Sequence, residues 1–408
     1  MNGSVSEERV RRHMVKLCES IGNRHVGSAG NHAAVDYARE VLQRSGWTVE
    51  TPEFPCVDWT EGTARLIVDG KARPAKVSPY SLSYDGEATM IAAASNEELA
   101  ATDIRGRIVL LHGEIAREQI MPKNFVFYNP DHHQRIVALL EEKQPAALLC
   151  ATGKNPEVAG SVYPFPLFED GDFDIPSVYM KDVDAEALLA HAGQKVRLTI
   201  ESERIASTAR NVIARRAGRS DRKIVFTAHI DAKLGTPGAL DNGTGVAALL
   251  QTAEAMQDMD PPHTIEIALL NGEDYYAVPG QMHYLHQHEG RWDSIRMVVN
   301  LDGTGYRDGR TAWSLYGVDE ELRHKVERLI EERAGFMIGE PWYQGDHSMF
   351  VQKGVPAVAI TSERFEMLCR DITHTAQDNL SQVETGKIAD VAAGLVELCT
   401  SQAAVEGT

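Results

Sequence analysis

The side chains best suited to chemistry are acidic residues and histidines that follow apolar runs of strand length in the C-terminal half of the chain. Ligands of α/β sheets bind beyond the carboxyl ends of the strands, so side chains at several such ends are expected to meet at one rim. The residues are His229 and Asp231 after 223–228, Asp241 and Asn242 in the glycine-rich loop that follows, Glu273 and Asp274 after 264–270, Asp302 after 295–301, and His374 and Asp378 after 355–360.

This set offers oxygen and nitrogen ligands and no sulfur, which suits Zn²⁺ or a related divalent ion. A cluster of carboxylates at a dry crevice repels itself unless its pKa values rise or cations neutralise it. Cations are the better explanation because imidazoles lie among the carboxylates, and two ions fit if one carboxylate bridges them. Single residues of this kind are more often helix caps, but their recurrence at successive strand ends argues against coincidence.

The elements that must position these residues alternate between strands and helices from Arg210 onward. Continuous apolar runs such as 223–228 are typical of strands in a sheet that helices bury on both faces. Nearer the N-terminus, two helices over about 4–21 and 31–45 precede a strand at 47–54. The sequence therefore predicts an α/β fold with a mostly parallel central sheet flanked by helices on both faces.

The middle of the chain, from about 58 to 205, has a different pattern. Short β-like runs such as 107–111 and 146–150 alternate with turn signals, which predicts that this part of the chain is rich in short strands. His132 and His133 are adjacent on a predicted helix and project about 100° apart, so we interpret them as a solvated surface pair.

Composition and charge narrow the function classes. Apolar residues make up 43% of the 408 residues and charged residues 25%, as in ordinary globular chains. The net charge of −18 argues against a nucleic-acid partner and against a polybasic membrane anchor. We find no signal peptide and no apolar stretch long enough to span a membrane. Five scattered cysteines favour neither disulfides nor a thiolate zinc site, so we expect a cytoplasmic protein.

The candidate residues lie in motifs that resemble those of the co-catalytic dizinc aminopeptidase family, which includes bacterial leucyl aminopeptidases, glutamate carboxypeptidase and the transferrin receptor. The resemblance is close over about 206–408 and moderate over 6–54. It implies the zinc exopeptidase fold for a discontinuous catalytic domain of residues 1–57 and 206–408. The motifs are Ala-His229-Ile-Asp231, Asp241-Asn242-Gly-Thr-Gly, Gly-Glu273-Asp274, Asn-Leu-Asp302-Gly, Gly345-Asp346-His347-Ser-Met-Phe350 and His374-Thr375-Ala-Gln-Asp378.

Residues 58–205 are similar to a protease-associated domain, on the segments 105–111, 145–149 and 174–178. Domains of that kind usually shape substrate access or oligomer contacts and carry no chemistry. The resemblance therefore implies that the catalytic residues lie outside this insertion.

The resemblance also implies a role for each residue of the candidate set. Asp231 would orient the ring of His229, and Glu273 would be the general base that takes a proton from water and returns it to the leaving amine. Asp378 is expected to be a structural hydrogen-bond acceptor, and the Asp241–Asn242 peptide bond is expected to be cis. Two divalent ions, zinc by resemblance, would be held by His229 and Asp302, by Asp274 and His374, and by Asp241 as the bridge.

Two positions depart from the family pattern. The family usually has Glu where this chain has Asp274, which is one methylene shorter and allows monodentate or tighter coordination. Some relatives have Tyr directly before the last histidine, where this chain has Thr373, so an oxyanion donor is missing there. Tyr343 and His347 are the candidates to replace it, and Asp346 is undecided between a helix cap and a substrate contact.

The resulting prediction is a dinuclear zinc-dependent exopeptidase, an aminopeptidase that cleaves the N-terminal bond of a peptide or aminoacyl amide with a metal-bridging water. A carboxypeptidase or an N-acyl amino-acid amidohydrolase stays open, because Arg364 and Arg370 would favour a carboxylate substrate. A non-catalytic binding homologue would have lost ligands, and none is lost here. Glutaminyl cyclases use one metal, and the intact His229 argues against that class. A homodimer is left open.

Overall fold

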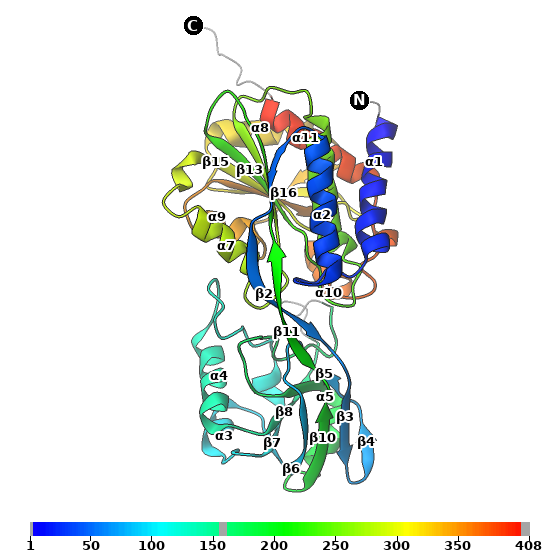
Figure 1. Ribbon diagram of the computed structural model, residues 1–408, viewed down its shortest axis with the longest axis vertical. Helices are drawn as coiled ribbons and strands as arrows, with labels where there is room; N and C mark the ends of the chain where they lie inside the picture. The colour runs from blue at the N-terminus through cyan, green and yellow to red at the C-terminus, as the bar shows by residue number, and fades with distance from the viewer. Residues whose placement is uncertain (1–2, 155–160, 401–408) are drawn as a thin grey trace.

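A mixed eight-stranded sheet forms the centre of the larger of two lobes in the computed structural model, which describes residues 3–154 and 161–400 (Figure 1). In sheet order its strands are β1 (Thr48–Glu50), β12 (Val212–Arg216), β14 (Thr264–Leu270), β13 (Lys223–His229), β15 (Ile295–Leu301), β18 (Ala357–Ser362), β16 (Thr311–Tyr316) and β17 (Phe336–Ile338). The inner strands β14, β13, β15 and β18 run parallel, and β12 and β16 pair antiparallel with the outermost of them, β14 and β18. The carboxyl ends of the parallel strands therefore meet at one edge.

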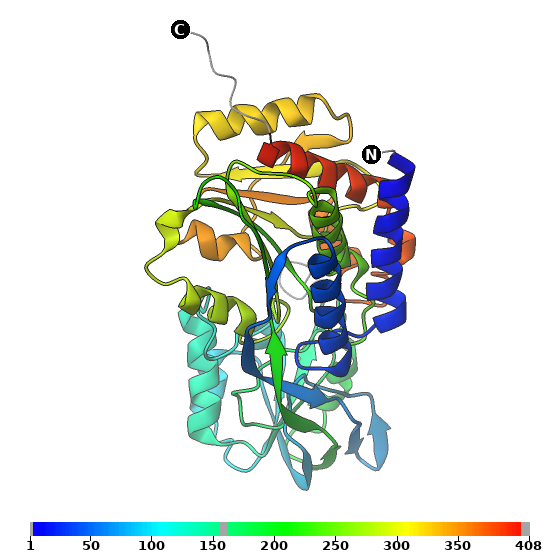
Figure 2. The same ribbon diagram turned by 45° about the horizontal axis from the view of Figure 1, so that its top comes forward.

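Helices cover both faces of this sheet. Successive residues of a strand point to opposite sides, so each strand contributes to a hydrophobic core on either face. In β13, Phe226 packs into the core on one face and Val225 into the core on the other. The first face is covered by α1 (Gly3–Val15), α2 (Ala29–Arg44), α6 (Thr244–Ala255), α8 (Glu320–Glu331) and α11 (Thr385–Thr400). The second is covered by α7 (Pro279–Gln287) and α9 (His347–Val351) (Figure 2). The predicted α/β class with a helix-covered sheet is confirmed.

Shorter helices connect these layers. One further helix of the larger lobe, α10 (Phe365–Asp371), follows β18. Two short π-type segments are η1 (Lys16–Ile21) and η3 (Ala239–Gly243), and the backbone of η3 leaves the helical conformation at Asp241 and Asn242. The short 3₁₀ helices are η2 (Gly113–Ala116), η4 (Trp292–Ser294) and η5 (Leu380–Gln382). None of the helices in the described ranges is long and apolar enough to cross a membrane.

The smaller lobe has a second sheet with hydrophobic clusters of its own. In sheet order its strands are β4 (Lys71–Arg73), β3 (Ala64–Val68), β10 (Lys195–Ile200), β6 (Tyr84–Ala93), β7 (Ile108–Leu111), β8 (Ala147–Thr152), β9 (Ser177–Lys181) and β5 (Lys76–Val77). Its helices are α3 (Asn96–Ala101), α4 (Asp131–Lys143) and α5 (Asp182–Leu189).

A two-stranded antiparallel ribbon joins the lobes (Figure 1). It consists of β2 (Glu53–Thr60), which leads into the smaller lobe, and β11 (Glu203–Arg210), which leads back. Asp58 pairs with Ile205 in this ribbon, so the two predicted boundaries of the insertion, at 57/58 and 205/206, face each other. The similarity of the smaller lobe to a protease-associated domain stays a prediction.

Several predicted elements differ from the observed ones at their boundaries. The strand predicted at 47–54 is interrupted between β1 and β2, where Pro52 has no N–H to donate to a ladder. The strand predicted at 355–360 begins only after Pro356. Strands β6, β11, β12 and β16 and helices α3 and α10 were not predicted.

Arg24 ties the N-terminal segment of the chain to the loop that carries Asp241. Its side chain is 1% exposed, which is rare for a charged group. The guanidinium donates hydrogen bonds of 2.8–3.3 Å to the backbone carbonyl oxygens of Leu17, Ile230, Pro237 and Gly238. One buried cation thus fixes the backbone of the loop after β13.

We predict that Arg24→Leu lowers the free energy of unfolding by about 2–5 kcal/mol, because several buried carbonyl groups lose their donor at once. Chemical denaturation of the full chain measures this. The matched control is Arg105→Leu, because Arg105 is exposed and its guanidinium donates a hydrogen bond to the exposed side chain of Gln144. That change should stay within about 0.5 kcal/mol. Equal losses in the two variants would contradict the role of Arg24.

Candidate metal centre

Asp241 lies between two imidazoles at the carboxyl edge of the central sheet. Its Oδ1 is 3.1 Å from Nε2 of His229, the last residue of β13. Its Oδ2 is 3.1 Å from Nε2 of His374, which follows α10. The peptide bond between Asp241 and Asn242 is cis, as predicted. One carboxylate thus faces both histidines, which is the arrangement that bridging two cations requires.

Each histidine has one further carboxylate beside it. Asp302, directly after β15, has Oδ1 3.6 Å from His229 Nε2, and we call this pair the first half-site. Asp274, after β14, has Oδ1 3.0 Å from His374 Nε2, and we call this pair the second half-site. With Asp241 shared between them, the structure brings all five predicted ligands together.

The turn that carries Glu273 and Asp274 is held by the buried carboxylate of Asp231. That carboxylate accepts the backbone N–H groups of Gly272, Glu273 and Asp274 at 2.7, 3.2 and 3.2 Å. It lies 3.7 Å from Nδ1 of His229, which is longer than a hydrogen bond. Asp231 therefore holds the turn directly, whereas we predicted that it would orient the ring.

Asp378 holds the other side of the centre. Its carboxylate accepts the backbone N–H groups of Leu240 at 2.7 Å and Asp241 at 3.1 Å. This confirms the structural role expected for Asp378. His374, four residues earlier, has a φ of 61°, which is uncommon for a residue with a side chain. Backbone conformations of this kind are often found at functional sites.

The acidic groups of the centre outnumber the imidazoles, and their pKa values show it. Burial raises the pKa of Asp302 to about 6, and it raises that of Glu273 well above its usual range. Burial opposes protonation of His374, but the charges of Asp274 and Asp241 outweigh it and raise its pKa to about 10. Without cations, the negative charge of the carboxylates is not balanced, so both the carboxylates and His374 hold protons more strongly than usual.

The residues present fit two divalent cations. Nε2 of His229 and Oδ2 of Asp274 are buried and have no hydrogen-bond partner, although a buried polar atom normally has one. Both atoms are good ligands for Zn²⁺, and both lie where the carboxylates concentrate negative charge. His229, Asp241 and Asp274 also offer ligand atoms within 4.8 Å of one another.

A cleft between the two lobes opens onto this centre. Its volume is about 1140 Å³, and Glu273, Asp274 and His374 lie in its wall. This exceeds the common range of small-molecule pockets, so the cleft has room for several residues of a peptide. Much of its wall is apolar or aromatic: Met121, Phe125, Phe127, Tyr128 and Val162 from the smaller lobe, and Tyr275, Tyr276, Val278, Tyr343 and Met349 from the larger.

The three residues proposed for substrate contacts have different positions. Tyr343 lines the cleft and is 67% exposed. His347 does not line it: the ring is fully buried, with Nε2 2.8 Å from the Trp342 carbonyl oxygen and Nδ1 3.4 Å from Asn300 Nδ2. Both ring nitrogens are therefore engaged inside the protein, and burial lowers the pKa of His347 to about 4.

Asp346 is 2% exposed and does not cap α9 with its side chain. Its Oδ1 accepts a hydrogen bond from Gln281, and its buried Oδ2 has no hydrogen-bond partner. The helix-cap alternative is therefore not formed, and a role beside the centre remains a prediction.

Two functional candidates, Lys233 and Glu169, were missed in the sequence. Lys233 follows Asp231 by two residues, and Glu169 lies in the smaller lobe. Their side chains form a largely buried ion pair in the wall of the cleft, with 2.5 Å between Lys233 Nζ and Glu169 Oε1. Proximity to Asp231 was a signal for Lys233, but nothing in the sequence around Glu169 pointed to the centre.

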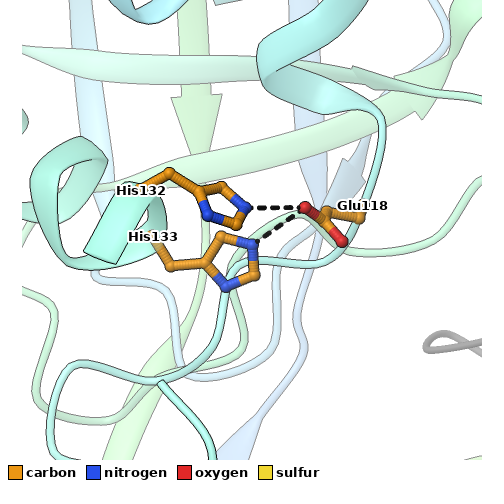
Figure 3. Close-up of side chains that lie close together, drawn as sticks. All are labelled: Glu118, His132 and His133. Carbon is orange, nitrogen blue, oxygen red and sulfur yellow. Dashed lines mark hydrogen bonds and ion pairs between the residues drawn. The ribbon is translucent and has the colours of Figure 1, made fainter. Parts of the chain in front are cut away.

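The interpretation of His132 and His133 as a solvated pair is wrong for His133, which is 1% exposed. His132 Nε2 and His133 Nε2 lie 2.8 and 3.3 Å from Oε1 of Glu118 (Figure 3). Nδ1 of His133 accepts the backbone N–H of Met121, so the neutral ring carries its proton on Nε2. A protonated Nε2 faces Glu118 at ion-pair distance and is not available as a metal ligand, although the three side chains cluster closely enough for one ion.

Residues 211–399 match the family model described as peptidase family M28. This segment contains all five predicted ligands together with Asp231 and Glu273. The larger lobe of the chain is therefore similar to peptidase family M28 over this segment.

Similar curated proteins are aminopeptidases by name. The probable lipoprotein aminopeptidase LpqL of Mycobacterium tuberculosis is 27% identical over 322 residues, which are 74% of this chain and 60% of LpqL. An aminopeptidase of Pseudomonas aeruginosa is 23% identical over 371 residues, which are 86% of this chain and 61% of the relative. The chain thus spans about 60% of the length of these two relatives.

Two solved structures share the fold along nearly the whole chain. The aminopeptidase from Aneurinibacillus sp. strain AM-1 has a TM-score of 0.74 and 19% identity, covering 98% of this chain and 96% of its own. The zinc aminopeptidase BSAP from Bacillus subtilis has a TM-score of 0.74 and 17% identity, with the same coverage. The zinc exopeptidase fold expected from the motifs is therefore confirmed.

We predict that Asp274→Asn loses one of two bound ions at limiting metal, because a charged ligand of the second half-site becomes neutral. Excess metal should restore part of the activity. Metal analysis after dialysis measures the loss. Glu118→Gln is the matched control and should retain both ions. Glu118 lies beside His132 and His133, where we expect no ion because Nε2 of His133 carries a proton. Full metal content in Asp274→Asn would remove Asp274 from the ligand set.

Proposed function

We propose that this chain is a zinc-dependent aminopeptidase whose centre holds two zinc ions. The observation that carries the proposal is the position of Asp241, with one carboxylate oxygen 3.1 Å from His229 and the other 3.1 Å from His374. The match of residues 211–399 to the model of peptidase family M28 supports the same conclusion. His229 and Asp302 would hold one ion, Asp274 and His374 the other, and Asp241 both.

The two ions, when bound, would acidify a water molecule and polarise the carbonyl group of the scissile bond. The chain's own contribution is the placement of a base beside them. Glu273 lies in the wall of the cleft, with Oε2 4.0 Å from His229 Nε2. Its carboxylate would take a proton from the attacking water and pass it to the nitrogen of the leaving amine.

Asp231 positions that base through the backbone. Its three hydrogen bonds from Gly272, Glu273 and Asp274 fix the turn, so the base and one ligand keep a constant separation. Correct placement within a fraction of an ångström is what makes a positioned base effective.

The cleft supports a peptide or aminoacyl amide substrate over the alternatives that need a carboxylate. Lys76 and Lys233 are the cationic side chains among the described residues that line it, and Lys233 is paired with Glu169. Arg364 and Arg370 do not line it, and Arg370 lies 2.8 Å from Asp371. A carboxypeptidase or N-acyl amidohydrolase therefore loses the observation that kept it open.

We also propose that the enzyme acts in a reducing compartment such as the cytoplasm. All five cysteines are free thiols, and Cys18, Cys150 and Cys399 are buried. Burial raises the pKa of Cys18 to about 11, which keeps this thiol in its unreactive form.

We predict that Glu273→Gln lowers kcat by about 10²–10⁴, the usual contribution of a positioned base. An amide cannot accept the proton of the attacking water. KM should change little, because ground-state binding is mostly untouched. Metal content should stay at the wild-type level, which separates this variant from Asp274→Asn. Turnover of aminoacyl amides and metal analysis test the prediction, and near-normal turnover by a fully loaded Glu273→Gln enzyme would exclude Glu273 as the base.

A further inference from the structure

Lys233 connects the smaller lobe to a ligand of the second half-site. Its Nζ donates a hydrogen bond to the backbone carbonyl oxygen of Asp274 and forms the 2.5 Å ion pair with Glu169. Only 20% of the Lys233 side chain and 8% of the Glu169 side chain are exposed. The ammonium group also lies 5.0 Å from the centre of the Tyr275 ring. Glu169 is thus the charge partner that keeps a largely buried cation beside Asp274.

A second contact from the same part of the smaller lobe reaches the other ligand of this half-site. The hydroxyl of Ser161 donates a 2.6 Å hydrogen bond to the backbone carbonyl oxygen of Thr373, the residue before His374. Ser161 and Glu169 lie in one connection between β8 and β9. We call the residues 161–169 the bracing segment.

The first half-site has a different environment. Its two ligands, His229 and Asp302, directly follow or end the parallel strands β13 and β15 of the larger lobe. The backbone N–H of Asp302 donates to the carbonyl oxygen of Ile360 in the neighbouring strand β18, so the sheet itself fixes this residue. Asp274 and His374 lie farther from a strand, in turns that need other support.

We propose that the bracing segment belongs to the metal centre as a positioning element, and that it supports the second half-site but not the first. Glu169 acts through Lys233 on the backbone of Asp274, and Ser161 acts on the backbone before His374. This inference rests on the proposed two-metal function. It assigns to the smaller lobe a part in binding one particular ion, beyond shaping access to the cleft.

The physical reason lies in the geometry of ligands on turns. A carboxylate ligand must stay oriented toward the ion although neighbouring carboxylates repel it. An outer partner that fixes the ligand's backbone lowers the free-energy cost of holding this orientation. Loss of such partners typically weakens metal binding by about 10–100-fold. Here the partner comes from the other lobe, so the two ions should respond differently to changes in the bracing segment.

The experiment is a Zn²⁺ titration of the metal-free full chain in competition with a chromophoric chelator, which yields two dissociation constants. The ion that weakens in Asp274→Asn identifies the second half-site. Lys233→Met and Glu169→Gln should each weaken that ion by about 10–100-fold and leave the other unchanged. Ser161→Ala should weaken the same ion.

A double-mutant cycle tests whether Glu169 acts through Lys233. The double variant Glu169→Gln/Lys233→Met should bind the second ion no more weakly than Lys233→Met alone, because both changes remove one linkage. Additive losses would show that Glu169 acts independently and would overturn this part of the proposal.

The matched control is Asp170→Asn. Asp170 is the next residue after Glu169 and is 5% exposed, but its carboxylate accepts the backbone N–H groups of Lys123 and Asp172, both at 2.8 Å, inside the smaller lobe. Asp170→Asn should lower stability without changing the ratio of the two dissociation constants.

The outcomes separate this inference from the proposed function. A wild-type chain that binds fewer than two ions overturns both. A wild-type chain with two ions and aminopeptidase activity, whose variants bind both ions normally or weaken both equally, overturns the inference alone. The inference would also be overturned if Asp170→Asn changed the ratio of the two dissociation constants as much as Glu169→Gln does. A general loss of order in the smaller lobe would then explain the weaker binding of the second ion.

Discussion

Repulsion between carboxylates at the carboxyl edge of the central sheet is the constraint on which the rest of the site depends. Four carboxylates meet two imidazoles there, so negative charge remains even when both rings are protonated. Such a cluster keeps its shape only if the backbone beneath it is fixed from outside. Asp231 and Asp378 hold backbone N–H groups on either side, and Arg24 holds the carbonyl groups of the loop between them.

The strands that could be predicted from the sequence are those that helices bury on both faces. Strands β13 and β14 are buried at every position after the first, so their sequences are continuous apolar runs that stand out without any structure. Strands β6 and β11 were missed because most of their residues are partly or fully exposed and mix polar with small side chains. Their pairing is set by partners distant in sequence, which local patterns do not record.

The same distinction applies to the site. His229, Asp241, Asp274, Asp302 and His374 could be identified because each lies close to the end of a recognisable strand or within a motif. Glu169 could not, because its importance comes from the packing of one lobe against the other. His133 was misjudged for a related reason: the spacing of two histidines on a helix gives their separation in angle but not which of them faces the core.

The two half-sites have different supports, and the support of the second half-site also forms part of the cleft. The cleft lies between the lobes, and Lys233, Glu169 and Asp274 all line it. If the proposed function holds, a movement of the smaller lobe that widened the cleft would stretch the contacts of Lys233 and Ser161 to the second half-site, whereas the sheet holds the first. Substrate access and the geometry of one ligand pair would then be coupled, because Lys233 and Glu169 line the cleft and Lys233 also contacts the backbone of Asp274.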